Sequence, residues 1–346
     1  VLQAPAVLRF GQKMPKTLIQ TTCSCYSIFS NLKTCLFMLR NYLKIALRNL
    51  ARNKVYSFIN IGGLAAGMAV AMLIGLWIWD ELSYDKYHEN YDRIAQVMQH
   101  QTFGDEVGTQ RSVPYLMAAE IRDKYGSDFK YVLQSTWVGG HILAHGETKL
   151  PNKGNYIEPQ APDLFSLKML RGTRAGLKEP YSILLSESVA KAFFGNADPL
   201  GKIMRVDNRS NVKVTGVYQD LPYNSSFREM TFMLPWALYL LENDWIEKME
   251  NPWGSNFTQT FVQLADHADM NKVSVKIKNV KLNKIDKGEA RFKPEVFLHP
   301  MSKWYLHSDW DEQGKNTGGR IQFVWLFGII GVFVLLLACI NFMNLA

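Results

Sequence analysis

Phe58 to Trp79 reads FINIGGLAAGMAVAMLIGLWIW, and this stretch decides the organisation of the chain. Its 22 residues include no Asp, Glu, Lys, Arg or His. A helix of roughly 20 apolar residues, rising about 1.5 Å per residue, crosses a bilayer core about 30 Å thick. Residues 58–79 are therefore predicted to form a first transmembrane helix.

Small residues recur at every fourth position of this stretch, at Gly63, Gly67, Ala71 and Gly75. Residues four apart lie on one face of a helix, and a row of small side chains lets a second helix approach closely. Gly63, Gly67 and Gly75 are therefore candidates for helix packing. The alternative stays open that glycine is simply common in membrane helices.

A second apolar run, residues 321–346, carries no charge and predicts a second transmembrane helix. Asn341 and Asn344 lie three apart within it and thus on one helix face. Amides in hydrocarbon are costly unless they bond to another helix, so both are packing candidates. Alternatively, Asn344 already lies at the cytoplasmic interface. Because the chain ends inside this run, we expect it to be truncated after the second span.

Charge is distributed very unevenly along the chain. Nine basic and no acidic residues precede Asp80, so residues 80–320 hold 30 of the 39 basic residues and all 31 acidic ones. The formal charge of +8 thus belongs to the N-terminal part, and the large domain is close to neutral. A clustered basic surface for nucleic acid is not indicated.

Residues 38–57 have the pattern of a basic amphipathic helix on the cytoplasmic membrane surface. The helix carries one apolar stripe, formed by Leu39, Leu43, Ala46, Leu47 and Leu50, and basic residues at four-residue steps beside it. Arg48, Arg52 and Lys54 are candidates for membrane-surface anchoring. The positive-inside rule then places the N-terminus in the cytoplasm and residues 80–320 in the periplasm. Residues 1–37 show no clear period and remain an unassigned extension.

Between the two runs, residues 80–320 predict an α+β domain with mixed or antiparallel sheets, since no steady βαβ rhythm is present. Strands are expected at 91–98, 132–138, 182–185, 211–218 and 261–264. Helices are expected in three places: one has Pro114 in its first turn and ends at Gly126, one runs from Ser186 to Gly195, and one is capped by Asp269.

No catalytic, cofactor-binding or metal-ligating set is predicted. Gly195 and Gly201 are separated by five residues including Pro199, and Ile203 follows Lys202, so the stretch reads as a helix end and turn, not as a phosphate loop. His141 and His145 are expected on a strand and turn among glycines. The four cysteines (Cys23, Cys25, Cys35 and Cys339) all lie outside the domain. The chain is thus not expected to be an enzyme.

Several stretches together resemble the permease subunits of MacB-like ABC transporters, with their FtsX-like membrane domain, in the versions found in Bacteroidetes-type bacteria. They are ALRNLARNKVYSFINIGGLAAGMA (46–69), SYDKYHENYDRIAQV (83–97), SILLSESVAKAFFGNADPLGKIMRVD (182–207), VKVTGVYQDLPYNSSF (212–227) and LLLACINFMNLA (335–346). The resemblance covers about residues 38–346.

This resemblance implies a MacB-like periplasmic core domain at 80–320, with a porter-like part and a smaller inserted part, in a multi-pass protein of the cell inner membrane. It implies mechanotransmission: ATP hydrolysis by a separate ATPase subunit moves the periplasmic domain, for export or extraction of a drug, peptide or lipoprotein. ATP and Mg would be bound by that partner, with no cofactor in this chain. A second permease copy or paralogue, membrane lipid, and a periplasmic adaptor or outer-membrane protein are the other expected partners. Arg48, Arg52 and Lys54 could then also contact the ATPase.

Two other classes share the predicted layout. An extracytoplasmic sensor or receptor domain between two spans would continue into a cytoplasmic signalling helix. A membrane-anchored binding module or chaperone is the third interpretation. The glycine row, the two asparagines and the family stretches favour the permease.

The packing interpretation predicts that Gly67→Leu weakens assembly of the full permease, because a large side chain would keep the second helix away. The yield of the assembled complex in detergent measures this effect. An unchanged yield would contradict the interpretation.

Overall fold

The structure is a computed structural model that describes residues 54–345 and, before them, residues 38, 40–42, 44–45, 47–48 and 51–52. The predictions for residues 1–37, and for Leu39, Leu43, Ala46 and Leu50 of the amphipathic stripe, lie outside the described residues. The chain divides into two units, described separately below: Leu73–Gly331, and the stretches up to Met72 and from Val332.

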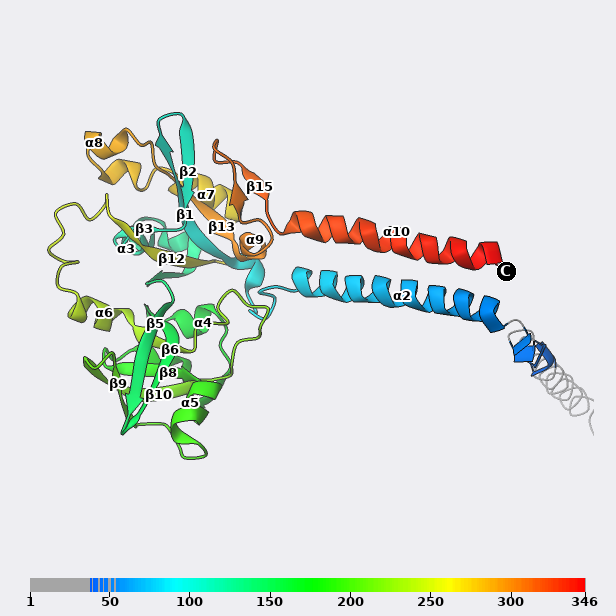
Figure 1. Cartoon of the computed structure of the whole chain (residues 1–346). Helices are drawn as coiled ribbons and strands as arrows, with labels where there is room; N and C mark the ends of the chain where they lie inside the picture. Colours follow the sequence, from blue (N-terminus) through cyan, green and yellow to red (C-terminus); the bar gives the residue numbers. More distant parts are fainter. Residues whose placement is uncertain are drawn as a thin grey trace, which may run out of the picture. The chain divides into compact units, whose positions relative to one another are not determined.

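Two long apolar helices, α2 (Lys54–Leu82) and α10 (Ile321–Leu345), flank the domain in the sequence (Figure 1). Their most apolar windows have mean hydropathies of 2.1 and 2.9. With 29 residues, α2 is about 44 Å long, which exceeds a bilayer core of about 30 Å. Both helices are therefore long and apolar enough to cross a membrane.

The first part of the domain, called the sheet lobe, is an antiparallel sheet with helices on one face (Figure 1). Val97, Val262, Ile121 and Ile277 belong to the apolar cluster between this sheet and its helices. The elements are β1 (Ile94–Phe103), β2 (Glu106–Gln110), β3 (Val113–Pro114), α3 (Met117–Tyr125), β4 (Phe129–Ser135), β12 (Asn256–Leu264), α7 (Met270–Ile277), α8 (Lys287–Ala290) and β13 (Glu295–Pro300). The last elements before α10 are α9 (Met301–Trp304), β14 (Asp309–Trp310) and β15 (Asn316–Gly318).

The second part, called the ring lobe, is inserted between β4 and β12 of the sheet lobe. Its strands run in the order β11-β8-β10-β9-β5-β6, and β11 also pairs with β6, which closes a ring. The pairs β8–β10 and β6–β11 are parallel, and the other ring pairs are antiparallel. Its elements are β5 (Gly139–His145), β6 (Thr148–Ile157), α4 (Ala161–Leu164), β7 (Met169–Gly172), β8 (Ser182–Ser186), α5 (Glu187–Phe194), β9 (Ile203–Val206), β10 (Ser210–Tyr218), β11 (Phe232–Pro235) and α6 (Trp236–Glu242). The predicted α+β class with mixed sheets between two apolar helices is confirmed.

One apolar cluster joins the two lobes. Leu133 and Phe261 contribute to it from the sheet lobe, and Leu184 and Tyr218 from the ring lobe. Tyr218 is fully buried and donates its hydroxyl hydrogen to the carbonyl oxygen of Met230 at 2.7 Å. Burial of its polar group is thereby compensated, and the lobes share one core.

Local sequence signals correctly predicted where several helices begin or end. Gly195 ends α5 with φ +58°, and the Asp269 carboxylate accepts a hydrogen bond from the backbone N–H of Lys272 at 2.9 Å. Ser186 precedes α5, although its side chain makes no capping hydrogen bond. His141 and His145 lie on β5, as expected.

The prediction that Pro114 lies in the first turn of a helix was wrong. Pro114 belongs to the two-residue strand β3, opposite Asn256 of β12, and α3 begins only at Met117. A short edge strand tolerates a residue without an N–H, so pairing with a distant strand outweighed the local helix signal.

Gly172 is the position where a side chain would cost most. Its φ is +69°, and a Cβ would overlap the backbone oxygen of Thr215 in the paired strand β10. Gly172→Ala is expected to lower the free energy of unfolding by about 3 kcal/mol, from the backbone conformation and the overlap together. The matched control is Gly104→Ala, since Gly104 has φ +65° with open space around it and should lose only about 1 kcal/mol. Urea unfolding followed by near-UV circular dichroism measures both, and equal losses would contradict the role of the overlap.

Candidate functional site: the junction between the apolar helices and the domain

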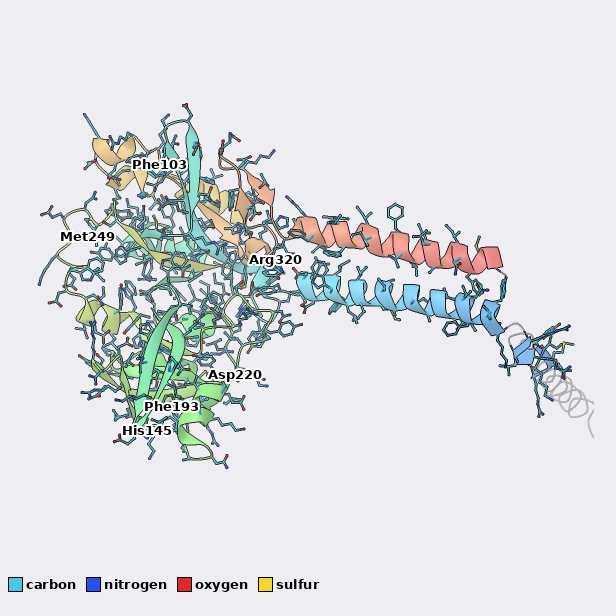
Figure 2. All side chains as sticks on the ribbon, in the orientation of Figure 1. Phe103, His145, Phe193, Asp220, Met249 and Arg320 are labelled. Atoms are coloured by element: carbon cyan, nitrogen blue, oxygen red, sulfur yellow. The ribbon has the colours of Figure 1, made fainter. Side chains whose placement is uncertain are left out.

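The last turn of α2 and the residue before α10 meet in an ion pair whose carboxylate is buried. Glu81, in the last turn of α2, is only 5% exposed. Arg320, labelled where α10 begins in Figure 2, donates from Nη2 to Glu81 Oε1 at 3.2 Å and from Nε to Oε2 at 3.3 Å. This two-pronged pairing fixes the guanidinium relative to the carboxylate and compensates the burial of the charge.

Two tyrosines complete this side of the junction. The Tyr305 hydroxyl donates to Glu81 Oε1 at 3.1 Å, and the Tyr305 ring stacks on Tyr84 with centroids 3.5 Å apart. The Arg320 guanidinium lies 4.6 Å from the centroid of the Tyr305 ring. Burial and the charge of Glu81 raise the pKa of Tyr305 to about 12, so its hydroxyl keeps the hydrogen that it donates.

The segment that follows α2 is held by a loop of the ring lobe. Asp85 is 1% exposed with φ +60°, and its carboxylate accepts from the backbone N–H and the hydroxyl of Ser226, both at 2.6 Å. The Asn224 side chain donates to the Ser83 hydroxyl oxygen at 2.9 Å. Burial raises the pKa of Asp85, and the two hydrogen bonds from Ser226 oppose that rise.

His88 extends this contact into the shared core. Its Nδ1 lies 2.7 Å from the carbonyl oxygen of Phe165 and therefore carries the donated hydrogen. Its Nε2 then faces the Ser225 hydroxyl at 3.4 Å as an acceptor. Burial lowers the pKa of His88, so the ring is neutral at pH 7. The junction, defined by Glu81, Tyr84, Asp85, His88, Tyr305 and Arg320 with the loop 222–227, thus contacts both lobes.

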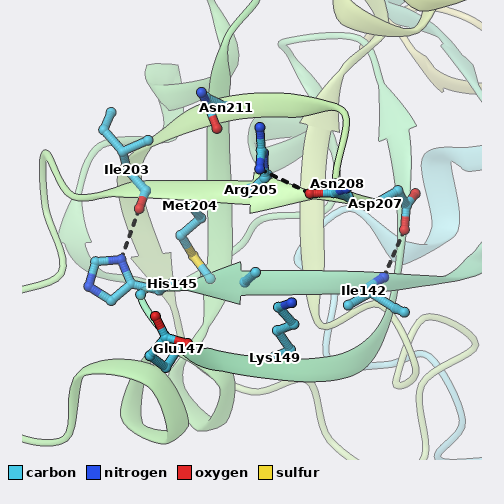
Figure 3. Close-up of a pocket in the computed structure, with 12 residues that line it drawn as sticks. Ile142, His145, Glu147, Lys149, Ile203, Met204, Arg205, Asp207, Asn208 and Asn211 are labelled. Atoms are coloured by element: carbon cyan, nitrogen blue, oxygen red, sulfur yellow. Dashed lines mark hydrogen bonds between the residues drawn. The ribbon is translucent and has the colours of Figure 1, made fainter.

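A separate hollow of about 720 Å³ lies on the β5–β6–β9 side of the ring lobe, away from Arg320 (Figures 2 and 3). Three of its polar side chains bond within the lobe: His145 to the Ile203 carbonyl oxygen at 2.9 Å, Arg205 to Asn208 at 3.0 Å, and Asp207 to the Ile142 N–H at 2.8 Å. Among the described residues no group of three His, Cys, Asp or Glu could hold a metal ion. This hollow offers no catalytic arrangement.

The helix-packing candidates differ in whether they face α10. A Cβ at Gly67 would lie 2.5 Å from the Cβ of Ala338, and one at Gly63 would lie 3.0 Å from the side-chain nitrogen of Asn341, so these residues face α10. A Cβ at Gly75 would have no neighbour within 4 Å among the described residues. The prediction for the Asn344 side chain lies outside what the structure describes. That these contacts serve assembly of a permease stays a prediction.

The basic candidates are exposed and helical. Arg48 and Arg52 lie in helical backbone before α2, and Lys54 is the first residue of α2. Anchoring to a membrane surface and contact with an ATPase both remain predictions for them.

The sequence reasoning did not single out the residues of the junction. Two signals pointed to them: the first apolar run is followed by Asp80 and Glu81 and the second is preceded by Arg320, and the stretches 83–97 and 212–227 both carried the family resemblance. The structure brings these stretches together at Asp85 and Ser226. Their pairing could not be read from local periodicity.

The ion pair should contribute more to stability than an exposed pair. Glu81→Gln is expected to lower the free energy of unfolding by about 2 kcal/mol, because a hydrogen bond to a buried charged group is strong. A double-mutant cycle with Arg320→Gln should give a coupling energy of about 1 kcal/mol in urea unfolding. The matched control is Glu229→Gln, which breaks an exposed pair with Lys153 at 3.0 Å and should change stability by less than about 0.5 kcal/mol. Zero coupling between Glu81 and Arg320 would show that the pair does not hold the junction.

Three solved structures are similar to this chain, and the first of them supports the fold. A domain of a permease protein from Porphyromonas gingivalis aligns with a TM-score of 0.52 at 22% identity, over 62% of this chain and 91% of that one. The periplasmic region of MacB from Actinobacillus actinomycetemcomitans aligns at 19% identity, over 62% and 94% of the two chains, with a TM-score of 0.44. The extracellular domain of the ABC-type transporter YknZ from Gram-positive bacteria aligns at 17% identity, over 59% and 99%, with a TM-score of 0.40.

Comparison with curated protein sequences gave no match. The model of the MacB-like periplasmic core domain matches residues 57–280, which is more than half of the chain. The chain therefore belongs to the MacB-like periplasmic core domain family, the periplasmic part of ABC-type permeases.

Proposed function

We propose that this chain is a permease component in which the apolar helices move the periplasmic domain when a separate ABC ATPase hydrolyses ATP. The family supports an ABC-type permease and, in general terms, an ATPase partner. Export or extraction of a drug, peptide or lipoprotein is the class of work that such movement would serve.

In this proposal α2 and α10 cross the inner membrane. Their length and hydropathy support a spanning role. The nine basic residues before Asp80, without an acidic one, favour a cytoplasmic N-terminus by the positive-inside rule, which leaves the domain in the periplasm. The proposed functional segments are the amphipathic helix (38–57), the first span (58–79), the periplasmic domain (80–320) and the second span (321–346).

The observation that carries the proposal is the Glu81–Arg320 ion pair at the junction. It ties the end of one apolar helix to the beginning of the other, and Tyr305 ties both to the sheet lobe. Asp85 and His88 tie the same segment to the ring lobe and the shared core. Since packed protein interiors are hardly compressible, a displacement of either helix end would be passed to the whole domain.

The remaining components of the transporter are proposed from the family. Arg48, Arg52 and Lys54 would contact lipid headgroups or the ATPase, which would bind ATP and Mg. A second permease copy or paralogue and a periplasmic adaptor or outer-membrane protein would complete the assembly. The packing of Gly67 against Ala338 supports close helix association within the chain.

The proposal can be tested by measuring the height of the domain above a membrane. The permease is purified with its ABC ATPase partner and reconstituted in nanodiscs, with its native cysteines replaced by serine. Energy transfer runs from a dye on Glu147→Cys, an exposed turn of the ring lobe, to a dye on lipid headgroups. We expect the transfer efficiency to change between the nucleotide-free state and the state with ATP and vanadate.

Removing the Glu81–Arg320 ion pair should weaken this ATP-dependent change in transfer efficiency. In the double variant Glu81→Gln, Arg320→Gln we expect ATP hydrolysis to continue while the change in transfer efficiency becomes smaller, because one of the connections between the helix ends and the domain is lost. The matched control is Lys153→Gln, Glu229→Gln, which removes an exposed ion pair elsewhere in the domain. No ATP-dependent change in transfer efficiency in the parent protein, or a full change in the double variant of Glu81 and Arg320, would refute the proposal.

A further inference from the structure

A cavity of about 430 Å³ opens beside the junction, and nothing in the proposed mechanism uses it. We call it the aromatic cavity, after its lining by Trp137, Phe227, Phe261 and Trp304. Its volume falls in the range of about 300–1,000 Å³ that is usual for small-molecule sites. Its lining combines apolar rings with polar side chains, among them Gln96, Arg111 and Arg320.

The floor of the aromatic cavity is apolar. Phe227, Phe261 and Trp304 are between 3% and 9% exposed. The indole N–H of Trp304 is already donated to the carbonyl oxygen of His299 at 2.8 Å, so the ring presents apolar surface to the cavity. Trp137, by contrast, is 46% exposed. An apolar group of a ligand would be removed from water here.

The polar groups of the cavity favour an anion. Arg111 is exposed in the turn between β2 and β3, and among the residues that the structure describes it has no ion pair or hydrogen bond. Arg320 is the second guanidinium in the lining, with half of its side chain exposed despite its bond to Glu81. Burial and the charge of Arg111 lower the pKa of nearby His299 to about 4, so His299 adds no charge at pH 7. Guanidinium groups bind carboxylate and phosphate oxygens with matched geometry.

Gln96 provides an independent sign of an absent ligand. It lies on β1, is 4% exposed and contributes to the lining of the aromatic cavity. Its side-chain Nε2 is buried and has no hydrogen-bond partner within the described part of the chain. A buried donor without a partner is costly, and native structures rarely keep one without a reason. A ligand oxygen seated beside Gln96 and the two arginines would supply the acceptor once the Gln96 side chain rotates, since Nε2 itself exposes almost no surface.

We propose that the aromatic cavity binds a small amphiphilic anion, a carboxylate or phosphate monoester that carries one apolar group. The anionic group binds Arg111, Arg320 and the Gln96 amide, and the apolar group packs on Phe227, Phe261 and Trp304. The proposal does not depend on the movement of the domain. It adds a ligand that shares Arg320 with the junction.

The test is calorimetric titration of octanoate into the full chain held in nanodiscs of neutral phosphatidylcholine, with empty nanodiscs as the blank for partitioning. We expect saturable binding with a Kd below about 1 mM. Octanamide, which has the same apolar group without the charge, should bind at least about tenfold more weakly, because hydrogen bonds to charged groups are the stronger ones. Octyl phosphate should bind as octanoate does.

Two substitutions locate the site. Arg111→Gln and Gln96→Met should each weaken octanoate binding, the first at least about tenfold. Arg209→Gln is the matched control, since Arg209 is an exposed arginine in the turn between β9 and β10 of the ring lobe. A change in the thermal unfolding temperature on adding octanoate provides a second readout that requires no activity.

The outcomes separate clearly. Equal binding of octanoate and octanamide, affinity unchanged in both cavity variants, or no saturable binding up to about 10 mM would overturn the proposal. If nanodiscs containing phosphatidic acid, a lipid with a phosphate monoester headgroup, weaken octanoate binding, the anion is a membrane lipid headgroup. If they leave the affinity unchanged, it is a water-borne molecule. Since ATP-dependent movement is not measured here, failure of this test leaves the proposed function standing.

Discussion

The buried carboxylate of Glu81 is the constraint on which the junction depends. A charge removed from water is tolerated only where hydrogen bonds and an opposite charge replace its hydration. Here Arg320 and Tyr305 supply both, and each comes from a segment more than 200 residues further along the chain. Because the carboxylate cannot be left unpaired, the residue that precedes α10 and the residues after α9 must occupy defined places relative to the last turn of α2.

The second half of the junction follows from the first. Once α2 ends at Leu82, the chain turns sharply, and Asp85 takes a positive φ that the hydrogen bonds from Ser226 compensate. His88 then enters the apolar cluster that both lobes share. A short segment after the helix therefore contacts the inserted ring lobe, while Tyr305 connects the same helix end to the sheet lobe. The domain is held at several points by groups whose separate removal would leave buried polar atoms without partners.

The two hollows of the domain differ in how far their polar groups are already satisfied. In the larger one, His145, Arg205 and Asp207 bond to neighbours in the same lobe. In the aromatic cavity, Arg111 and the Gln96 amide have no partner among the described residues, and Arg320 takes part in the junction. The buried Gln96 donor without a described partner, more than volume, distinguishes the aromatic cavity from the larger hollow. A ligand bound at Arg320 would therefore alter the hydrogen bonds that Arg320 donates to Glu81.

The sequence alone determined the features that local patterns encode. The apolar runs, the charge asymmetry around Asp80, the α+β class, the end of α5 at Gly195 and the Asp269 cap depend on neighbouring residues, and the family stretches were recognisable as strings. Tertiary structure decided what depends on distant partners. Pro114 joined a strand because β12 offered an edge, Gly67 met Ala338 whereas Gly75 met no described neighbour, and Glu81 paired with Arg320. Helix and strand periods are local, but the choice of partner for a buried charge is made by packing, which no short stretch of sequence contains.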